Sequence, residues 1–304
     1  MKTKFSKDFL YFAWFSLIFC LSLVVLDQLL GAGFNYYYHQ QYAGTLYRTN
    51  MSIDSTRAQV VIVGSSRANY HYDAPLMSRK LGKTVYNCGR EGQGLLYSCA
   101  VVSAIVARHR PELVIMDILP KELSFHEEER LASLLPYYQN KEIRPYLDFA
   151  DKYQEVKLLS KTYPFNSLLT SIIVGRLSYS GREKEEAGFI SLEGRIPRNE
   201  VIHTERDDQN LVLRDKLLLF EIFLGKMERQ KIHCLLVMSP MYNHYIPGAT
   251  RKFCKLINSK YKFIRFLDFT NKTEYFDPSL YNDSFHLNDT GAARFSAEVV
   301  KRIH

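Results

Sequence analysis

The stretch VVIVGSSRANYHYD, residues 60–73, indicates how the chain folds. Four consecutive apolar residues run directly into Gly64, Ser65 and Ser66. A short run of β-branched residues that ends in small, turn-forming residues is typical of a buried strand followed by a loop. Two hydroxyl groups at the end of such a strand could cap the next helix, bind a phosphate or include a nucleophile.

Apolar strand-like runs alternate with helix-like segments on both sides of this stretch. Strands are expected at residues 59–63, 84–87, 113–119, 231–240 and 263–269, and helices at 71–81, 95–109, 214–231, 249–260 and 288–303. Parallel strands need a crossover of helical length between them. The alternation therefore predicts an α/β domain with a flavodoxin-like, doubly wound parallel sheet in a three-layer α/β/α arrangement. Ligands of such sheets bind beyond the carboxyl ends of the strands, where residues 64–66 would lie.

The N-terminus predicts a single membrane-spanning helix. Residues 9–26 carry no charge, and a helix of that length extends about 27 Å, close to the hydrocarbon thickness of a bilayer. Three lysines precede the run, and the first lysine or arginine after it is Arg48, so the N-terminus is expected inside and the domain outside the cytoplasm, periplasmic or at the cell surface. Small residues at 31–33 leave a cleaved signal peptide as the alternative.

We divide the chain accordingly into an anchor at residues 1–31, a tyrosine-rich connector at 32–57 and a domain at 58–304. Residues 120–210 break the alternation, since they hold charged clusters, several prolines and short amphipathic pieces such as YQEVKLLSKTY, residues 153–163. We expect them to form an inserted cap over one end of the sheet, where a substrate pocket would be shaped.

Composition excludes other classes of protein. The content of 46% hydrophobic and 24% charged residues is ordinary for a folded globular chain, which argues against disorder. The net charge of +8 comes from scattered basic residues without a nucleic-acid-binding motif, so no nucleic-acid partner is predicted. The five cysteines form no C-x-x-C pair and are expected to be mainly buried free thiols.

Three polar segments follow expected strands: residues 64–67, residues 87–92 (Asn-Cys-Gly-Arg-Glu-Gly) and residues 283–288 (Asp-Ser-Phe-His-Leu-Asn). A parallel sheet would bring all three to one edge. Catalysis by a serine nucleophile needs a hydroxyl, an imidazole that takes its proton, and a carboxylate that orients the imidazole. Asp283 and His286 are close enough in sequence to approach that hydroxyl from one loop.

These segments resemble the motifs of the SGNH (GDSL-type) hydrolase superfamily: Gly-x-Ser near the domain start, Asn-x-Gly-x-x-Gly after the second strand, and Asp-x-x-His-Leu-Asn near the C-terminus. The resemblance covers residues 59–118 and 233–304 and looks closest to membrane-anchored DltD-like and alginate-acetylation-like proteins of the cell envelope. It implies that Ser66 is the nucleophile, His286 the base and Asp283 the orienting acid. It also implies an oxyanion hole formed by Gly92 and the Ser66 backbone N–H.

The sequence departs from this family at two places. Gly-Ser-Ser replaces Gly-Asp-Ser, which makes Ser65 a second candidate nucleophile. The family's Gly-x-Asn-Asp block has no counterpart, and Lys121, in ILPKEL at 118–123, stands where the oxyanion asparagine would be. Asn87 is expected to brace its loop and to reach the serine loop. Arg67 is expected to be solvated or salt-bridged, and His71 to be an ordinary loop histidine.

The predicted activity is hydrolysis or transfer of acyl esters on a cell-envelope or exported polysaccharide, through a Ser-His-Asp triad and an acyl-enzyme, without a metal or cofactor. Expected partners are an acylated glycan or acyl donor, the membrane and a membrane-bound acyltransferase. One alternative is a non-catalytic protein of the same fold that binds a glycan or the acyltransferase. Another is a phosphate- or nucleotide-binding domain, although it would lack both the P-loop lysine and a G-x-G-x-x-G.

Overall fold

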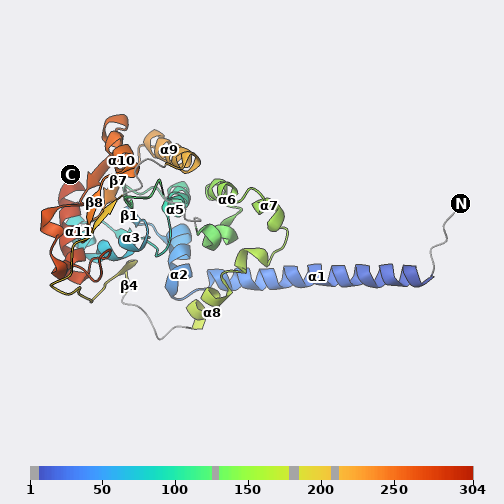
Figure 1. The fold of residues 1–304 in the computed structure, drawn as a ribbon. Helices are drawn as coiled ribbons and strands as arrows, with labels where there is room; N and C mark the ends of the chain where they lie inside the picture. Colours follow the sequence, from blue (N-terminus) through green and yellow to red (C-terminus); the bar gives the residue numbers. More distant parts are fainter. Residues whose placement is uncertain (1–6, 125–129, 178–184, 207–211, 304) are drawn as a thin grey trace.

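The computed structural model describes residues 7–124, 130–177, 185–206 and 212–303 (Figure 1). Lys2 and Lys4, on which the expected orientation of the anchor depends, lie outside these residues, as do most of the charged runs at 126–130 and 181–186. The centre of the domain is a parallel sheet with the strand order β2-β1-β3-β7-β9. Its strands are β1 (Val60–Val63), β2 (Val85–Asn87), β3 (Leu113–Asp117), β7 (His233–Met238) and β9 (Ile264–Asp268). The prediction of a mixed α/β fold around a parallel sheet is confirmed.

Both faces of this sheet are buried, which explains the uninterrupted apolar runs in the sequence. Side chains alternate across β1, so that Val61 and Val63 join one hydrophobic cluster while Val60 and Ile62 join another. One face is covered by α3 (Ser66–His71), α4 (Ala74–Leu81) and α11 (Asp289–Ile303), and the other by α5 (Leu95–Arg108), α9 (Arg214–Arg229) and α10 (Ala249–Lys260).

The expected helix at 71–81 is two helices, α3 and α4. The break between them is set by Asp73, whose side chain accepts a 2.8 Å hydrogen bond from the Leu76 backbone N–H and so caps α4. Because α3 ends there, it is a separate short helix that begins at Ser66, directly after β1.

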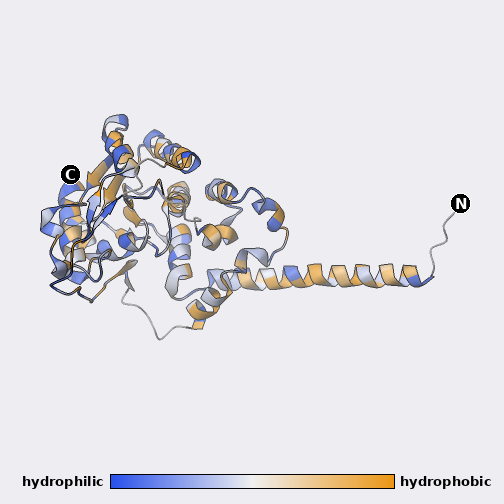
Figure 2. Cartoon of the chain, viewed as in Figure 1, coloured by the Kyte–Doolittle hydropathy of each residue, from blue (hydrophilic) through white to orange (hydrophobic). Residues whose placement is uncertain are grey.

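One helix in the described part of the chain, α1 (Lys7–His39), is long and apolar enough to cross a membrane. Helices of this kind occur both as membrane anchors and as signal sequences. Figure 2 shows its hydrophobic residues along the length that projects from the domain. The helix continues past the expected boundary at residue 31. Gly31 does not end the helix. Instead it allows Lys161 to approach closely, because a Cβ added at this glycine would lie 2.4 Å from the Lys161 Cβ.

The expected connector is folded into the domain. After α1 it forms α2 (Gly44–Asn50) and a π-helical turn, η1 (Met51–Ser55), in which Leu46 and Ile53 are buried in the cluster that α5 also enters. Tyr38 is buried as well, and its hydroxyl donates a 2.6 Å hydrogen bond to the Ser133 carbonyl. Residues 32–57 therefore pack against the domain through buried side chains between α1 and the sheet.

Within the region at 120–210, two parts, one of helices and turns and one of strands, pack in different places. The first part packs against α1, α2 and α5, with α6 beside α5 and α8 on the other side of α1 in Figure 1. It comprises η2 (Leu131–Tyr137), α6 (Arg144–Ala150), α7 (Gln154–Lys157), η3 (Tyr163–Phe165) and α8 (Leu169–Leu177). The second part comprises β4 (Glu185–Glu186), β5 (Phe189–Ile190) and β6 (Thr204–Arg206), which pairs with β8 (His244–Ile246).

The second part runs past the carboxyl end of the sheet. Its Ala187 carbonyl accepts a 2.8 Å hydrogen bond from the Asn87 N–H, and its Leu192 carbonyl accepts one of 2.7 Å from Asp289 at the start of α11. Two short turns, η4 (Thr273–Tyr275) and η5 (Pro278–Leu280), precede the loop at 281–288, which leads into α11. Residues 185–206 thus lie over this end of the sheet, whereas the helices between residues 131 and 177 pack against α1, α2 and α5.

Candidate active site

The turn between β1 and α3 positions Ser66. Gly64 has a φ of +144°, and a Cβ on this residue would lie 2.8 Å from the Ala68 Cβ and 2.9 Å from the Asp117 carbonyl oxygen. Only glycine fits both the backbone conformation and the space. The chain can therefore turn sharply from a central strand into α3, which leaves Ser66 at the carboxyl edge of the sheet.

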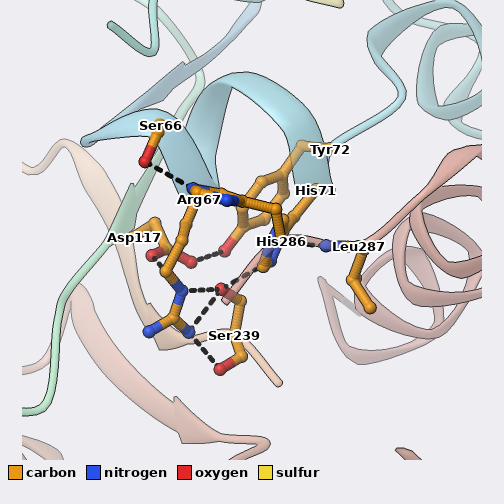
Figure 3. Close-up of polar contacts among 8 residues, drawn as sticks. All are labelled: Ser66, Arg67, His71, Tyr72, Asp117, Ser239, His286 and Leu287. Atoms are coloured by element: carbon orange, nitrogen blue, oxygen red, sulfur yellow. Dashed lines mark hydrogen bonds and ion pairs between the residues drawn. The ribbon is translucent and has the colours of Figure 1, made fainter. Parts of the chain in front are cut away.

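Ser66, His286 and Asp283 form one hydrogen-bonded chain of side chains. The Ser66 Oγ lies 2.8 Å from His286 Nε2, although the two residues are 220 positions apart in sequence. On the other side of the ring, His286 Nδ1 lies 2.9 Å from Asp283 Oδ2 and 3.0 Å from Oδ1. Figure 3 shows His286 reaching Ser66 from the opposite side of the site. The sequence-predicted trio is brought together at hydrogen-bonding distance.

The Asp283 carboxylate determines which ring nitrogen of His286 carries the hydrogen. Burial raises the pKa of Asp283, but hydrogen bonds from the His286 ring and the Phe285 backbone N–H outweigh that effect and lower the pKa to about 2. The carboxylate is thus ionised at neutral pH and accepts the hydrogen on Nδ1 of the ring. His286 Nε2 is then left as the acceptor that faces the Ser66 hydroxyl.

His71 supports the loop that carries His286, and it is not the ordinary loop histidine expected. It is fully buried at the end of α3, where its Nε2 accepts a 3.1 Å hydrogen bond from the Leu287 backbone N–H. Its Nδ1 therefore carries the hydrogen, which it donates to the Ser239 Oγ at 3.0 Å. Burial, followed by the charges of Arg67 and His286, holds the pKa of His71 well below its usual value.

Beneath the triad, Arg67 forms a buried ionic network. Its Nε is 3.0 Å from the Ser239 Oγ and 3.7 Å from Asp117 Oδ1, and its guanidinium also donates to the Ser239 carbonyl. The Tyr72 hydroxyl donates a 2.7 Å hydrogen bond to the other Asp117 oxygen. Figure 3 shows the guanidinium between Asp117 and Ser239. Of the two expected states of Arg67, the salt-bridged one is found, in the core of the protein.

Asp117 and Ser239 are functional-site neighbours that the sequence analysis missed. Asp117 is the last residue of β3, and Ser239 directly follows β7. Both therefore lie at the carboxyl ends of strands, which is the same signal that located residues 64–67. Burial raises the pKa of Asp117, and the adjacent Arg67 charge opposes the rise.

Asn87 braces its own loop and also α3. Its amide nitrogen donates to the carbonyls of Ala68 at 2.7 Å and Tyr72 at 3.0 Å, and its oxygen accepts a 2.9 Å hydrogen bond from the Gly89 N–H. Because both amide hydrogens are engaged with carbonyls of this segment, Asn87 acts on the site by holding α3 and has no side-chain hydrogen left for an oxyanion.

A cavity of about 330 Å³ adjoins the triad loop at Phe285 and includes Gly92 and Lys121 in its wall. Lys121 lies 3.9 Å from Glu205 and 5.8 Å from the centre of the Tyr245 ring. The cavity is thus lined by aromatic groups and by charges of both signs.

Ser65 occupies the position before the first residue of α3, and its carbonyl accepts a 3.2 Å hydrogen bond from the Asn69 N–H. The hydroxyl that faces His286 Nε2 is that of Ser66. Of the two adjacent serines, Ser66 therefore has the base within reach.

No protein-family model matches the chain, and no curated protein matches it in sequence. What the site can do therefore follows from its own chemistry. A hydroxyl, an imidazole nitrogen free to accept its proton, and an ionised carboxylate behind the ring form the arrangement that makes a serine oxygen nucleophilic.

Proposed function

We propose that the chain is a membrane-anchored, extracytoplasmic serine esterase or O-acyltransferase. The observation that carries the proposal is the hydrogen-bonded order Ser66, His286, Asp283, with distances of 2.8 Å and 2.9 Å between successive groups. The Ser66–His286 distance supports an enzyme over a non-catalytic protein of the same fold, because a binding protein has no need of a base at its serine.

In the proposed reaction, His286 Nε2 takes the Ser66 proton while Oγ attacks the acyl carbonyl of an ester. The negative charge of Asp283 stabilises the imidazolium that results. The tetrahedral adduct then collapses, and the imidazolium gives its proton to the departing alkoxide, which leaves the acyl group on Ser66. Water or a sugar hydroxyl, deprotonated in turn by His286, attacks this acyl-enzyme and restores the serine.

The oxyanion of the adduct needs hydrogen-bond donors at the start of α3. The Ser66 N–H belongs to the first turn, where a helix supplies no carbonyl for it. The resemblance to SGNH hydrolases adds Gly92, and Lys121 stays a predicted third donor. Lys121 would have to leave Glu205, from which it is 3.9 Å away, to reach an oxyanion.

The proposed substrate is an acyl ester on a cell-envelope or exported polysaccharide. Two features support the SGNH type of fold on which this depends. Taken in chain order, the five strands are arranged 2-1-3-4-5, which is the flavodoxin-like order. Helices also cover both faces, as in a doubly wound, three-layer domain. The cavity of about 330 Å³ is near the lower limit for ligand pockets and suits one sugar unit or acyl group of a longer polymer.

The proposed topology rests on the length of α1 and on the lysines before its uncharged run. The 33-residue helix is longer than a bilayer requires, and lysines precede its uncharged run, so the proposal places the N-terminus in the cytoplasm and the triad outside it. A polymer exported to or assembled at that surface would meet the site directly. A membrane-bound acyltransferase that delivers the acyl group is the proposed protein partner.

Labelling with a fluorophosphonate probe tests the proposal, since the probe phosphonylates only an activated serine. We expect the full chain in detergent to be labelled, and Ser66→Ala to lose the label. Ser65→Ala is the matched control and should keep it. Labelling that persists in Ser66→Ala but disappears in Ser65→Ala would assign the nucleophile to Ser65.

If neither the wild-type chain nor Ser65→Ala reacts, the non-catalytic alternative is favoured. That outcome would agree with the missing Gly-x-Asn-Asp block and with the engagement of Asn87 and Lys121 by other groups. For an active protein, the rate at which the chromophore is released from a chromogenic acetate ester is measured with and without added sugar acceptors. This separates hydrolysis from transfer, because a better acceptor accelerates only transfer.

A further inference from the structure

Residues 152–161, which we call the α7 segment, present large apolar side chains to the outside of the protein. Tyr153, Val156 and Leu159 have exposed fractions of 60%, 65% and 75%. They recur every third residue and so lie on one side of a helical turn, while Gln154 on the other side is buried. Three neighbouring apolar groups so exposed indicate a surface that meets something other than water.

The position of this segment along α1 is fixed by Asp27. Its carboxylate accepts hydrogen bonds of 2.7 Å from the Ser160 hydroxyl, the Lys161 N–H and the Thr162 hydroxyl, and one of 3.2 Å from the Thr162 N–H. Gly31, one turn further along α1, lets Lys161 approach the helix closely. The α7 segment is thus attached to α1 at a known depth (Figure 1).

That depth is where α1 leaves the hydrocarbon of a membrane. Asp27 is the first charged residue after the uncharged run at 9–26, whose length of about 27 Å matches a bilayer core. Leu159 is one residue from the loop that Asp27 holds. The apolar side chains of the α7 segment therefore lie beside the headgroup boundary. Figure 2 shows that α1 alone projects beyond the rest of the chain on this side.

The charges around the apolar side chains suit a lipid surface. Lys152, Lys157 and Lys161 belong to the same segment, and the Lys152 ammonium lies 5.1 Å from the Tyr153 ring centre. The nearby acids are paired with cations: Glu155 with Arg144 at 3.2 Å, and Asp151 with Lys157. Tyrosine and lysine together are typical of the region between headgroups and acyl chains.

We propose that the α7 segment inserts Tyr153, Val156 and Leu159 into the interface of the bilayer that α1 spans. This second contact fixes the tilt and rotation of the domain on the membrane. The inference rests on α1 being an anchor, as proposed above, and is independent of the triad. The favoured partner is lipid, not protein, because the depth of the segment is set by the anchor itself.

The test uses the full chain reconstituted into vesicles of phosphatidylcholine and phosphatidylglycerol. An environment-sensitive fluorophore is attached to single cysteines, and nitroxide-labelled lipid quenches any fluorophore in the bilayer. Native Cys20 reports on α1, while Val156→Cys and Leu159→Cys in a Cys20→Ser background report on the segment. Cys88, Cys99, Cys234 and Cys254 are buried, so they stay unlabelled.

Leu256→Cys in the same background is the matched control, since the exposed fraction of Leu256 on α10 is 64%, close to the 65% of Val156. We expect a loss of fluorescence at 156 and 159 approaching the loss at Cys20, and none at 256. Quenching at Cys20 without quenching at 156 and 159 overturns the second contact but leaves the anchor intact. A Cys20 label that is not quenched overturns both the second contact and the membrane anchor. The fluorophosphonate test of the triad does not depend on this result. Because the vesicles contain no other protein, a protein partner cannot produce the expected result.

Discussion

Asp283 determines which nitrogen of His286 carries the ring hydrogen, and this gives the first test at the residue scale. In Asp283→Asn the amide can donate to Nδ1, which would place the hydrogen on Nε2, opposite Ser66. We expect the rate constant of fluorophosphonate labelling to fall by about 10³- to 10⁴-fold, as in serine enzymes with this arrangement. Asp277→Asn is the control, because Asp277 caps η5 through Ser279 and lies outside the triad. Equal rates in the two variants would contradict the role of Asp283.

His71 predicts how stability depends on pH. Its pKa is lowered in the folded protein by burial and by the charges of Arg67 and His286, whereas in the unfolded chain it returns to about 6.5. The unfolded state therefore binds the extra proton as pH falls through 6.5, and the free energy of unfolding decreases by up to about 1.4 kcal/mol per pH unit from this residue.

We expect His71→Gln to be less stable than wild type at pH 7.5 but to lose less stability on going to pH 5.5. Urea unfolding in detergent at both pH values measures the difference, which should be smaller in the variant by about 1 kcal/mol. A variant with the full wild-type pH dependence would show that another histidine is responsible.

The sequence identified the three side chains that the structure brings together, but not the groups that hold them in place. Ser66, Asp283 and His286 stand in recognisable local patterns at the ends of expected strands. The contacts of His71 with Ser239 and Leu287 depend on the folded chain, because these residues are 168 and 216 positions away. Burial of Arg67 is equally invisible in sequence, since a charged residue is ordinarily expected on the surface.

At the scale of elements, the turn from β1 into α3 depends on Gly64. Gly64→Ala would place a methyl group 2.8 Å from the Ala68 Cβ in a backbone conformation that alanine resists. We expect a loss of about 3 kcal/mol in the free energy of unfolding, together with slower labelling because Ser66 is displaced. Urea unfolding and the labelling rate are measured on the same samples.

Gly225→Ala in α9 is the matched control. An added Cβ there would meet only the flexible end of Arg229 at 3.3 Å, and alanine favours the helix by about 0.5–1 kcal/mol. The control should therefore be as stable as wild type or more so. If both glycine variants lost the same stability, the tight packing of Gly64 would not be the cause.

The strands of the central sheet could be predicted because their apolar pattern is local. The apolar runs of β1, β3 and β7 alternate between two buried faces, so each reads as a strand without knowledge of its neighbours. In contrast, β6 is three residues long and exists because β8 pairs with it. Such strands depend on a partner that lies far away in sequence, and no local pattern encodes them.

At the scale of the whole molecule, the region at 120–210 packs in two places because its parts have different partners. Tyr38 of α1 packs edge-on against Tyr137, at 5.9 Å between ring centres, and also contacts Phe165. The helices that follow residue 130 are therefore built around α1. Amphipathic patterns indicate that these pieces have a buried side, but the partner of that side includes Tyr38 of α1, which was expected to lie in the connector.

Asp27 joins this helical part to α1, which leads to a prediction about how α1 is held to the domain. Asp27→Ala removes all four hydrogen bonds to residues 160–162. We expect amide hydrogen exchange at Lys161 and Thr162 to become about 10- to 100-fold faster, because the loop loses on the order of 1–3 kcal/mol of local stability. Exchange is measured on the full chain in detergent.

Ser22→Ala is the control for this variant, since the Ser22 hydroxyl bonds only within α1, to the Ile18 carbonyl at 2.8 Å. It should leave exchange at residues 161 and 162 unchanged. Fluorophosphonate labelling of Ser66 should be equal in both variants, because the triad depends on the turn after β1 and on the loop at 281–288. Unaltered protection in Asp27→Ala would mean that packing at Gly31 alone attaches the α7 segment to α1.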